Sequence, residues 1–211
     1  MRPSTDRLLV WLLALLIGAC AGPGPARRAA GDRSIPVPVS AAQRADFERA
    51  LAAMRKQRHA EAVPILERIF EENPRLPGVA INLAIAYLAM AEAEPEAAKR
   101  EPYHAKAERV LLKALEENPR EAAAHHQLGL VLRRQGRLEA ARDAYEKALD
   151  IDPQYALAHY NLAVLCDLYL QDTACAIRHF EAYRALRPEE AETIDAWLTE
   201  LRRRAGAGGA S

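Results

Sequence analysis

Between residues 43 and 204, apolar positions recur at intervals of three or four, which is the period of an α-helix. Small residues stand beside the large apolar ones at regular places, as at Gly129, Ala141 and Ala163. A small side chain at such a place lets two helices approach closely. No stretch alternates between apolar and polar positions as a half-buried strand does. The pattern predicts a fold built almost entirely from α-helices.

The last predicted helix is apolar along one side only. Ile194, Trp197, Leu198 and Leu201 fall at i, i+3, i+4 and i+7. The opposite side is acidic and ends in three arginines, which the helix dipole favours at a C-terminus. We expect this helix to cap the helices that precede it.

A longer pattern is superimposed on the helical one, because whole helix pairs repeat. Residues 122–155 carry the characteristic residues of such a unit: Leu128, Gly129, Gly136, Ala141, Tyr145, Ala148 and Pro153. With these residues the segment resembles the tetratricopeptide repeat (TPR), a unit of about 34 residues that folds as helix, turn and helix.

The same register extends in both directions, with repeats beginning at residues 43, 77, 122 and 156. The starts are 34, 45 and 34 residues apart, so the second repeat carries 11 extra residues. Three repeats close on Asn-Pro or Asp-Pro, and the residue before proline avoids the α region, which stops a helix. The predicted parts are four repeats, a cap and a disordered tail: residues 43–76, 77–121, 122–155, 156–188, 189–204 and 205–211.

A single hairpin of this kind cannot bury its apolar face alone, so neighbouring hairpins must stack. The resemblance therefore implies an all-α solenoid of about four TPR hairpins plus a C-terminal capping helix. It also implies a concave groove, lined by the first helix of each repeat, that binds a segment of a partner protein. The groove positions of the family fall here on Asn82, Ile85, His126, Gln127, Leu130, Arg133, Arg134, Tyr160, Asn161 and Val164.

Three kinds of polar side chain stand among these positions. Asn82 and Asn161 hold the place from which TPR proteins often bond a peptide backbone, and an amide offers both a donor and an acceptor. Arg133 and Arg134 are expected to pair with a carboxylate of an acidic partner, the alternative being that they are only the polar end of a helix. His126 is expected to turn toward the groove.

The extra residues of the second repeat, Glu92 to Pro102, contain two prolines that can start or stop helical turns. We expect this insertion to be a tolerated surface loop, and the alternative is a second contact surface.

The N-terminus carries a targeting signal. Arg2 and Arg7 precede an apolar run of 10 residues, Leu8 to Ile17. This run fits a signal-peptide core and is short for a membrane span. The run ends in Ile17-Gly18-Ala19-Cys20, which resembles a bacterial lipobox. The resemblance implies a lipoprotein signal peptide over residues 1–19 and acylation of Cys20. The alternatives are an ordinary secretory signal or an uncleaved anchor, with Cys20 incidental.

Residues 20–42 are rich in Pro, Gly and Ala and are expected to be a tether. The residue after Cys20 is alanine rather than aspartate, which resembles lipoproteins exported to the outer membrane. The predicted location is therefore the bacterial envelope, on the outer membrane facing the periplasm.

Charge and cysteine content narrow the chemistry. The chain has 29 basic and 29 acidic residues, so it lacks the cationic excess of a nucleic-acid-binding protein. Cys166 and Cys175 lie nine residues apart, where either a disulfide across a helix hairpin or two free thiols would fit. No metal-ligand spacing, catalytic set or cofactor motif is present in the sequence, so we expect no enzyme activity, no metal and no cofactor.

These observations favour a membrane-anchored periplasmic TPR scaffold or assembly factor that binds a protein segment of an envelope complex. The combination of lipobox and repeats resembles the TPR lipoproteins that act in pilus, secretin or envelope assembly. The alternatives are a periplasmic chaperone for unfolded clients, or a non-catalytic subunit of a cell-wall enzyme or of an energy-transducing transport complex.

Overall fold

The computed structural model describes residues 39–208, and all regular structure within this range is helical. The predicted signal peptide, Cys20 and most of the predicted tether lie outside the described residues. The elements are α2 Ala41–Arg55, α3 His59–Glu72, α4 Pro77–Ala93, α5 Ala97–Glu117, α6 Ala122–Arg134, α7 Leu138–Ile151, α8 Ala156–Leu168, α9 Thr173–Leu186, η2 Pro188–Glu190 and α10 Ala191–Gly208. None of these helices is long and apolar enough to cross a membrane.

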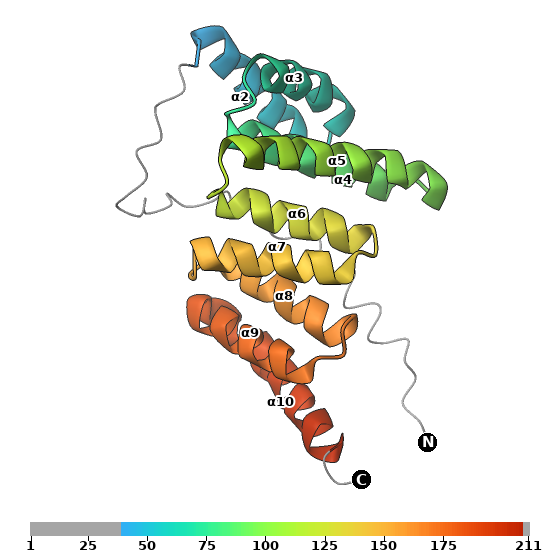
Figure 1. The fold of residues 1–211 in the computed structure, drawn as a ribbon, viewed down its shortest axis with the longest axis vertical. Coiled ribbons are helices and arrows are strands. Elements are labelled where there is room, and N and C mark those ends of the chain that lie inside the picture. The colour runs from blue at the N-terminus through green and yellow to red at the C-terminus, as the bar shows by residue number, and fades with distance from the viewer. Residues whose placement is uncertain (1–38, 209–211) are drawn as a thin grey trace. The chain divides into compact units, whose positions relative to one another are not determined.

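The helices form four consecutive hairpins, α2–α3, α4–α5, α6–α7 and α8–α9, which are followed by α10 (Figure 1). The second, third and fourth hairpins begin at Pro77, Ala122 and Ala156. Each hairpin packs on the next, so the prediction of an all-α solenoid of four hairpins and a cap is confirmed.

The two helices of each hairpin occupy different layers. Each first helix contacts the first helix of the next hairpin, in the pairs α2–α4, α4–α6 and α6–α8. Within residues 39–208 the backbones of successive second helices stay farther apart, although long side chains reach across, as where Lys113 Nζ of α5 lies 5.6 Å from the centre of the Phe70 ring of α3. The layer of first helices is therefore the crowded side of the stack, and the second helices spread apart on the other side. We call the layer of α2, α4, α6 and α8 the inner face. In Figure 1, α5, α7 and α9 lie nearer the viewer, on the outer face.

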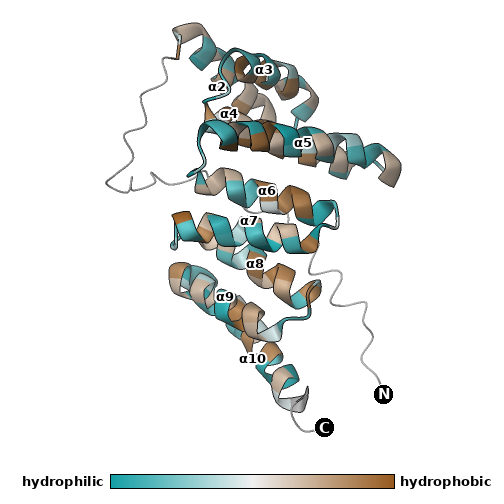
Figure 2. Cartoon of the chain, in the orientation of Figure 1, coloured by the Kyte–Doolittle hydropathy of each residue, from teal (hydrophilic) through white to brown (hydrophobic). Residues whose placement is uncertain are grey.

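The core runs continuously through the hairpins because each helix buries apolar residues against its neighbours. Every labelled helix in Figure 2 carries both hydrophilic and hydrophobic residues. Small residues at the helix crossings, such as Ala50, Ala84 and Ala163, are fully buried. Gly129 plays the same part in α6. A Cβ atom at this glycine would lie 2.5 Å from the ring of Tyr145, so the ring occupies the space that a side chain would need.

Three of the hairpin turns require a residue in the left-handed region. Gly136 supplies it with φ 75° between α6 and α7. Gln57 and Gln171 adopt φ 59° and 55° at the corresponding turns of the first and fourth hairpins, where TPR units usually have glycine. These two turns therefore form at the cost of some backbone strain.

The insertion is mostly helical, so the expectation of a surface loop for residues 92–102 is wrong. It lengthens α4 to 17 residues and α5 to 21 residues, leaving only three residues between them. Pro102 lies in the second turn of α5 and the helix continues through it. Ala97, Ala98 and Lys99 are good helix formers, which explains why the segment extends the hairpin. In Figure 1 the right-hand end of α5 extends beyond α6 and α7, which are drawn below it.

The last helix closes the solenoid. Ile194, Leu198 and Leu201 are each 1% exposed against α9, and the Trp197 ring contacts Phe180 with centroids 5.4 Å apart. The helix continues to Gly208, whereas we expected a disordered tail from residue 205. Alanine at positions 205 and 207 has the highest helix propensity, which accounts for the extension.

Candidate functional site

An aliphatic stripe follows the inner face. Ile85, Leu130 and Val164 hold the same repeat position on α4, α6 and α8, and each side chain is partly exposed. Leu51, which is not among the predicted groove residues, holds this position on α2 and is also partly exposed. The repeat register carried this signal, because residue 51 lies 34 residues before residue 85. Four hairpins thus contribute one partly exposed aliphatic residue each.

A row of amides accompanies this stripe. The Asn82 and Asn161 side chains donate from Nδ2 to the carbonyls four residues earlier, Gly78 O at 2.7 Å and Leu157 O at 2.9 Å. Within the described residues no hydrogen bond reaches the Oδ1 of either asparagine, so both oxygens are free to accept from a ligand backbone. Gln127 holds the same position on α6, and its Oε1 is buried without a partner. The Asn82 and Asn161 oxygens are therefore available as acceptors, whereas the Gln127 oxygen is shielded from solvent.

His126 belongs to the interior instead of the open groove, because its side chain is only 2% exposed. Asn161 Nδ2 donates to His126 Nε2 at 2.9 Å, which leaves Nδ1 as the protonated nitrogen facing Tyr155 Oη at 3.3 Å. Burial lowers the pKa of His126 to about 4, and the nearby Arg133 charge acts in the same direction. The neutral ring thus ties α6 to α8 and fixes the orientation of Asn161.

Arg133 and Arg134 turn in different directions, so they do not form one paired clamp. Arg134 pairs with Glu92 near the end of α4. The Arg133 guanidinium lies over the ring of Tyr169, 5.8 Å from its centroid, and so bridges α6 to the end of α8. Arg133 contacts no carboxylate among the described residues, and its Nε is buried without an acceptor.

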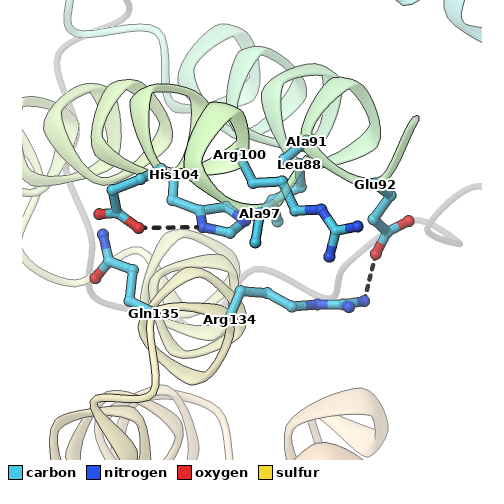
Figure 3. A pocket seen from close by; sticks show the side chains of 9 residues that line it. Leu88, Ala91, Glu92, Ala97, Arg100, His104, Arg134 and Gln135 are labelled. Atoms are coloured by element: carbon cyan, nitrogen blue, oxygen red, sulfur yellow. Dashed lines mark hydrogen bonds and ion pairs between the residues drawn. The ribbon is translucent and has the colours of Figure 1, made fainter. Parts of the chain in front are cut away.

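The Arg134 side chain lines a hollow of about 290 Å³ between the extended hairpin and the end of α6. Arg100 from α5 lines the same hollow, above a floor that includes Leu88 and Ala91 (Figure 3). Arg100 Nε donates to Glu94 O at 2.8 Å, so it caps the end of α4. The helical insertion thus forms one side of this hollow, and its Glu92 pairs with Arg134.

Tyr160 is partly exposed at the C-terminal end of the inner face. Its ring lies 5.1 Å from that of Tyr183 and 6.1 Å from that of Trp197, measured between centroids. Burial raises its pKa. Tyr160 therefore contacts the capping helix through Trp197.

The structure contains a disulfide between Cys166 in α8 and Cys175 in α9, with Cα atoms 5.9 Å apart. Asp172 lies between them, where its Oδ1 accepts from Cys175 N at 3.0 Å and caps α9. The Asp172 carboxylate also lies close to both sulfur atoms. With the cysteines joined, neither offers a thiolate to a metal ion.

A histidine pair reinforces the same hairpin. His159 Nε2 donates to Pro153 O at 3.1 Å, which leaves its Nδ1 to accept from His179 Nδ1 at 2.9 Å. His125 makes the equivalent bond to Pro119 O at 2.9 Å. The histidines at this repeat position therefore bond the turn before their helix. Burial lowers the pKa of His179 to about 4, and the neighbouring His159 acts in the same direction.

Two exposed apolar residues were not among the predicted groove residues. Leu168 and Tyr169, at the end of α8, are 57% and 48% exposed. Tyr169 ends the helix and lies outside the repeating helical positions, so the pattern alone did not select it.

Comparisons with known proteins identify the repeats. A family model described as TPR repeat matches residues 129–166, and one described as tetratricopeptide repeat matches residues 110–143. No curated protein matches the chain. Residues 110–166 therefore match models of the TPR repeat.

Solved structures of TPR proteins share the fold. TTC0263, a thermophilic TPR protein in Thermus thermophilus, is 19% identical with a TM-score of 0.55, and the match covers 75% of this chain and 98% of that one. For pilF of Pseudomonas aeruginosa the identity is 20% and the TM-score 0.64, with 79% and 70% covered. The first TPR of Spaghetti (RPAP3), bound to the HSP90 peptide SRMEEVD, is 21% identical with a TM-score of 0.50, with 59% and 90% covered.

Proposed function

We propose that this protein is a membrane-anchored periplasmic scaffold or assembly factor that binds a segment of a partner protein along its inner face. The observation that carries the proposal is the line of partly exposed aliphatic residues, Leu51, Ile85, Leu130 and Val164, one from each hairpin. Aliphatic side chains of a partner would gain free energy by covering this line, while its backbone N–H groups donate to the amide oxygens beside it.

The structural relatives support a binding role. The TPR of Spaghetti (RPAP3) is bound to a peptide of HSP90, so a stack of this kind can hold a protein segment. The likeness to pilF of Pseudomonas aeruginosa agrees with a pilus, secretin or other envelope complex as the setting. In this setting the partner is a protein segment of the envelope complex, and the protein acts by binding, without catalysis.

The anchor rests on the N-terminal sequence, Ile17-Gly18-Ala19-Cys20 after an apolar run. Acylated Cys20 would hold the solenoid at the outer membrane through the Pro-rich tether. Labelling with a radioactive fatty acid should mark the wild-type protein and not Cys20→Ala, and the variant should leave the outer-membrane fraction. Equal labelling of both forms would reject the anchor.

The binding role is tested by placing charge on the aliphatic stripe. Leu130→Glu combined with Val164→Glu should reduce co-purification of envelope proteins with the tagged chain by about tenfold, because a buried carboxylate without a partner opposes the apolar contact. The matched control is Leu112→Glu, since Leu112 is a 44% exposed leucine on the outer helix α5. Capture that is unaffected by the inner-face change would reject the proposal. Capture of many unrelated unfolded proteins, lost in the same variant, would identify a chaperone instead.

A further inference from the structure

The inner face contains a cation whose charge no side chain of the described residues neutralises. Each of the two first helices that contact α6 carries an acidic residue near its C-terminal end, and both of these residues are engaged elsewhere. Glu92 pairs with Arg134. Asp167 on α8 accepts from Arg204 of the capping helix at 2.6 Å. Arg133 is left over the ring of Tyr169 with its Nε shielded from solvent and without an acceptor.

The Arg133 Nε of α6 and the Tyr145 hydroxyl of α7 both lack a hydrogen-bond partner among the described residues. Tyr145 is fully buried beneath the C-terminal half of α6. The Arg133 charge acts on His126, Tyr145 and Tyr160, where it favours the lower pKa in each case. A ligand group that only accepts hydrogen bonds and carries negative charge would complement this place.

The neighbouring surface adds an apolar requirement. Leu168 is the most exposed large apolar side chain that the structure describes, and Tyr169 beside it is nearly as exposed. Leu130 and Val164 lie on the same two helices and are partly exposed. A carboxylate that reached Arg133 would lie beside the Tyr169 ring, on a face where α6 and α8 also present apolar side chains.

We propose that Arg133, held on Tyr169, is the specificity-determining contact of the inner face, and that it receives an aspartate or glutamate side chain of the partner segment with an apolar residue next to it. This inference rests on the proposed function and adds the chemistry of the ligand. It assigns different roles to the two adjacent arginines. Arg133 binds the acidic side chain of the partner, whereas Arg134 joins α6 to the extended hairpin through its ion pair with Glu92.

The experiment starts from a random 12-residue peptide library selected on the full-length chain in detergent. Selected peptides should be enriched in Asp or Glu next to an aliphatic or aromatic residue. A selected peptide and its Glu→Gln or Asp→Asn version are then titrated against wild type, Arg133→Gln and Arg134→Gln. On wild type the neutral peptide should bind about tenfold more weakly, as expected for loss of a charged hydrogen bond. Arg133→Gln should bind the acidic peptide about tenfold more weakly, with no further loss for the neutral one.

The adjacent variant is the control. Arg134→Gln removes the same charge one residue away, so it controls for the change in net charge. It should bind the acidic peptide within about twofold of wild type, because Arg134 is paired with Glu92. Arg133→Lys keeps the charge and loses the planar fork, so it should bind at an intermediate level and shows that the site is still folded. Equal losses in Arg133→Gln and Arg134→Gln, or equal affinity for acidic and neutral peptides, would overturn the inference while leaving groove binding intact. Failure to select any peptide whose binding depends on Leu130 would overturn both.

Discussion

At the scale of single residues, the packing of the hairpins depends on a glycine at a close helix contact and on a buried histidine that is uncharged. Gly129 lets the Tyr145 ring lie against the backbone of α6, which sets how closely α6 and α7 approach. His126 is buried as a neutral ring between Tyr155 and Asn161. Both features make predictions that do not depend on knowing the partner.

Gly129→Ala should destabilise the protein by about 1–3 kcal/mol, because the new methyl group would meet the Tyr145 ring at 2.5 Å and force helices apart. Gly78→Ala is the control, since nothing lies within 4 Å of the added Cβ at the start of α4. That change should be neutral or stabilise by up to about 1 kcal/mol. Urea unfolding followed by circular dichroism measures both. A Gly129→Ala protein as stable as wild type would show that the close approach is not needed.

Acid should destabilise the fold through His126. Its folded pKa of about 4 lies below the ordinary 6.5, so between these values the unfolded chain binds a proton that the folded chain does not. Stability is therefore complete above about pH 6.5 and falls as the pH drops toward 4. His126 alone should cost about 2 kcal/mol at pH 5, relative to pH 7.5. His179, whose pKa is lowered to about 4, acts in the same direction.

Unfolding curves at pH 7.5 and pH 5 measure this effect. His126→Gln removes the group that titrates, so the variant should lose less stability between the two pH values than wild type does. The same acid sensitivity in variant and wild type would show that His126 is not a source of it.

At the scale of helices and hairpins, signals in the repeat register were sufficient to place the elements. Prolines after Asn or Asp, and small residues at fixed intervals, located the starts of α4, α6 and α8 from sequence. The conformation of residues 92–102 could not be read in this way. Their alanines and charged residues favour a helix, but they carry no apolar stripe and include two prolines, so propensity and pattern disagreed.

The same limit applies to the candidate site. The repeat register placed Ile85, Leu130 and Val164 on the inner face. It could not separate Arg133 from Arg134, because the pairing of Arg134 depends on the helical course of the insertion that carries Glu92. Asp167 likewise pairs with Arg204 of the capping helix, which lies 37 residues further along the chain. Contacts of this range come from how hairpins stack, which a local pattern does not encode.

The α8–α9 hairpin should lose stability on reduction. The disulfide closes a loop of about ten residues, for which the chain-entropy relation gives about 2.5 kcal/mol. Melting curves with and without a reductant should therefore separate, with the reduced protein less stable. The Cys166→Ala, Cys175→Ala double variant should melt near the reduced protein and show no response to reductant. A wild-type curve that reductant leaves unchanged would contradict a structural role for the bond.

At the scale of the whole described domain, the consequence of stacking is a difference between two faces. The first helices approach one another closely and bring partly exposed aliphatic residues from four hairpins into one line, whereas the backbones of the second helices lie farther apart. The outer face carries isolated exposed apolar residues such as Leu112. Only the inner face offers a continuous surface on which a partner segment could contact every hairpin.

The most direct test of this account places a photo-crosslinking amino acid at Leu130 on the inner face or at Leu112 on the outer face, in bacteria that express the full chain. Irradiation of intact cells should yield a discrete crosslinked partner from position 130 and none from position 112. Crosslinks from position 112 with none from position 130 would contradict the assignment of binding to the inner face.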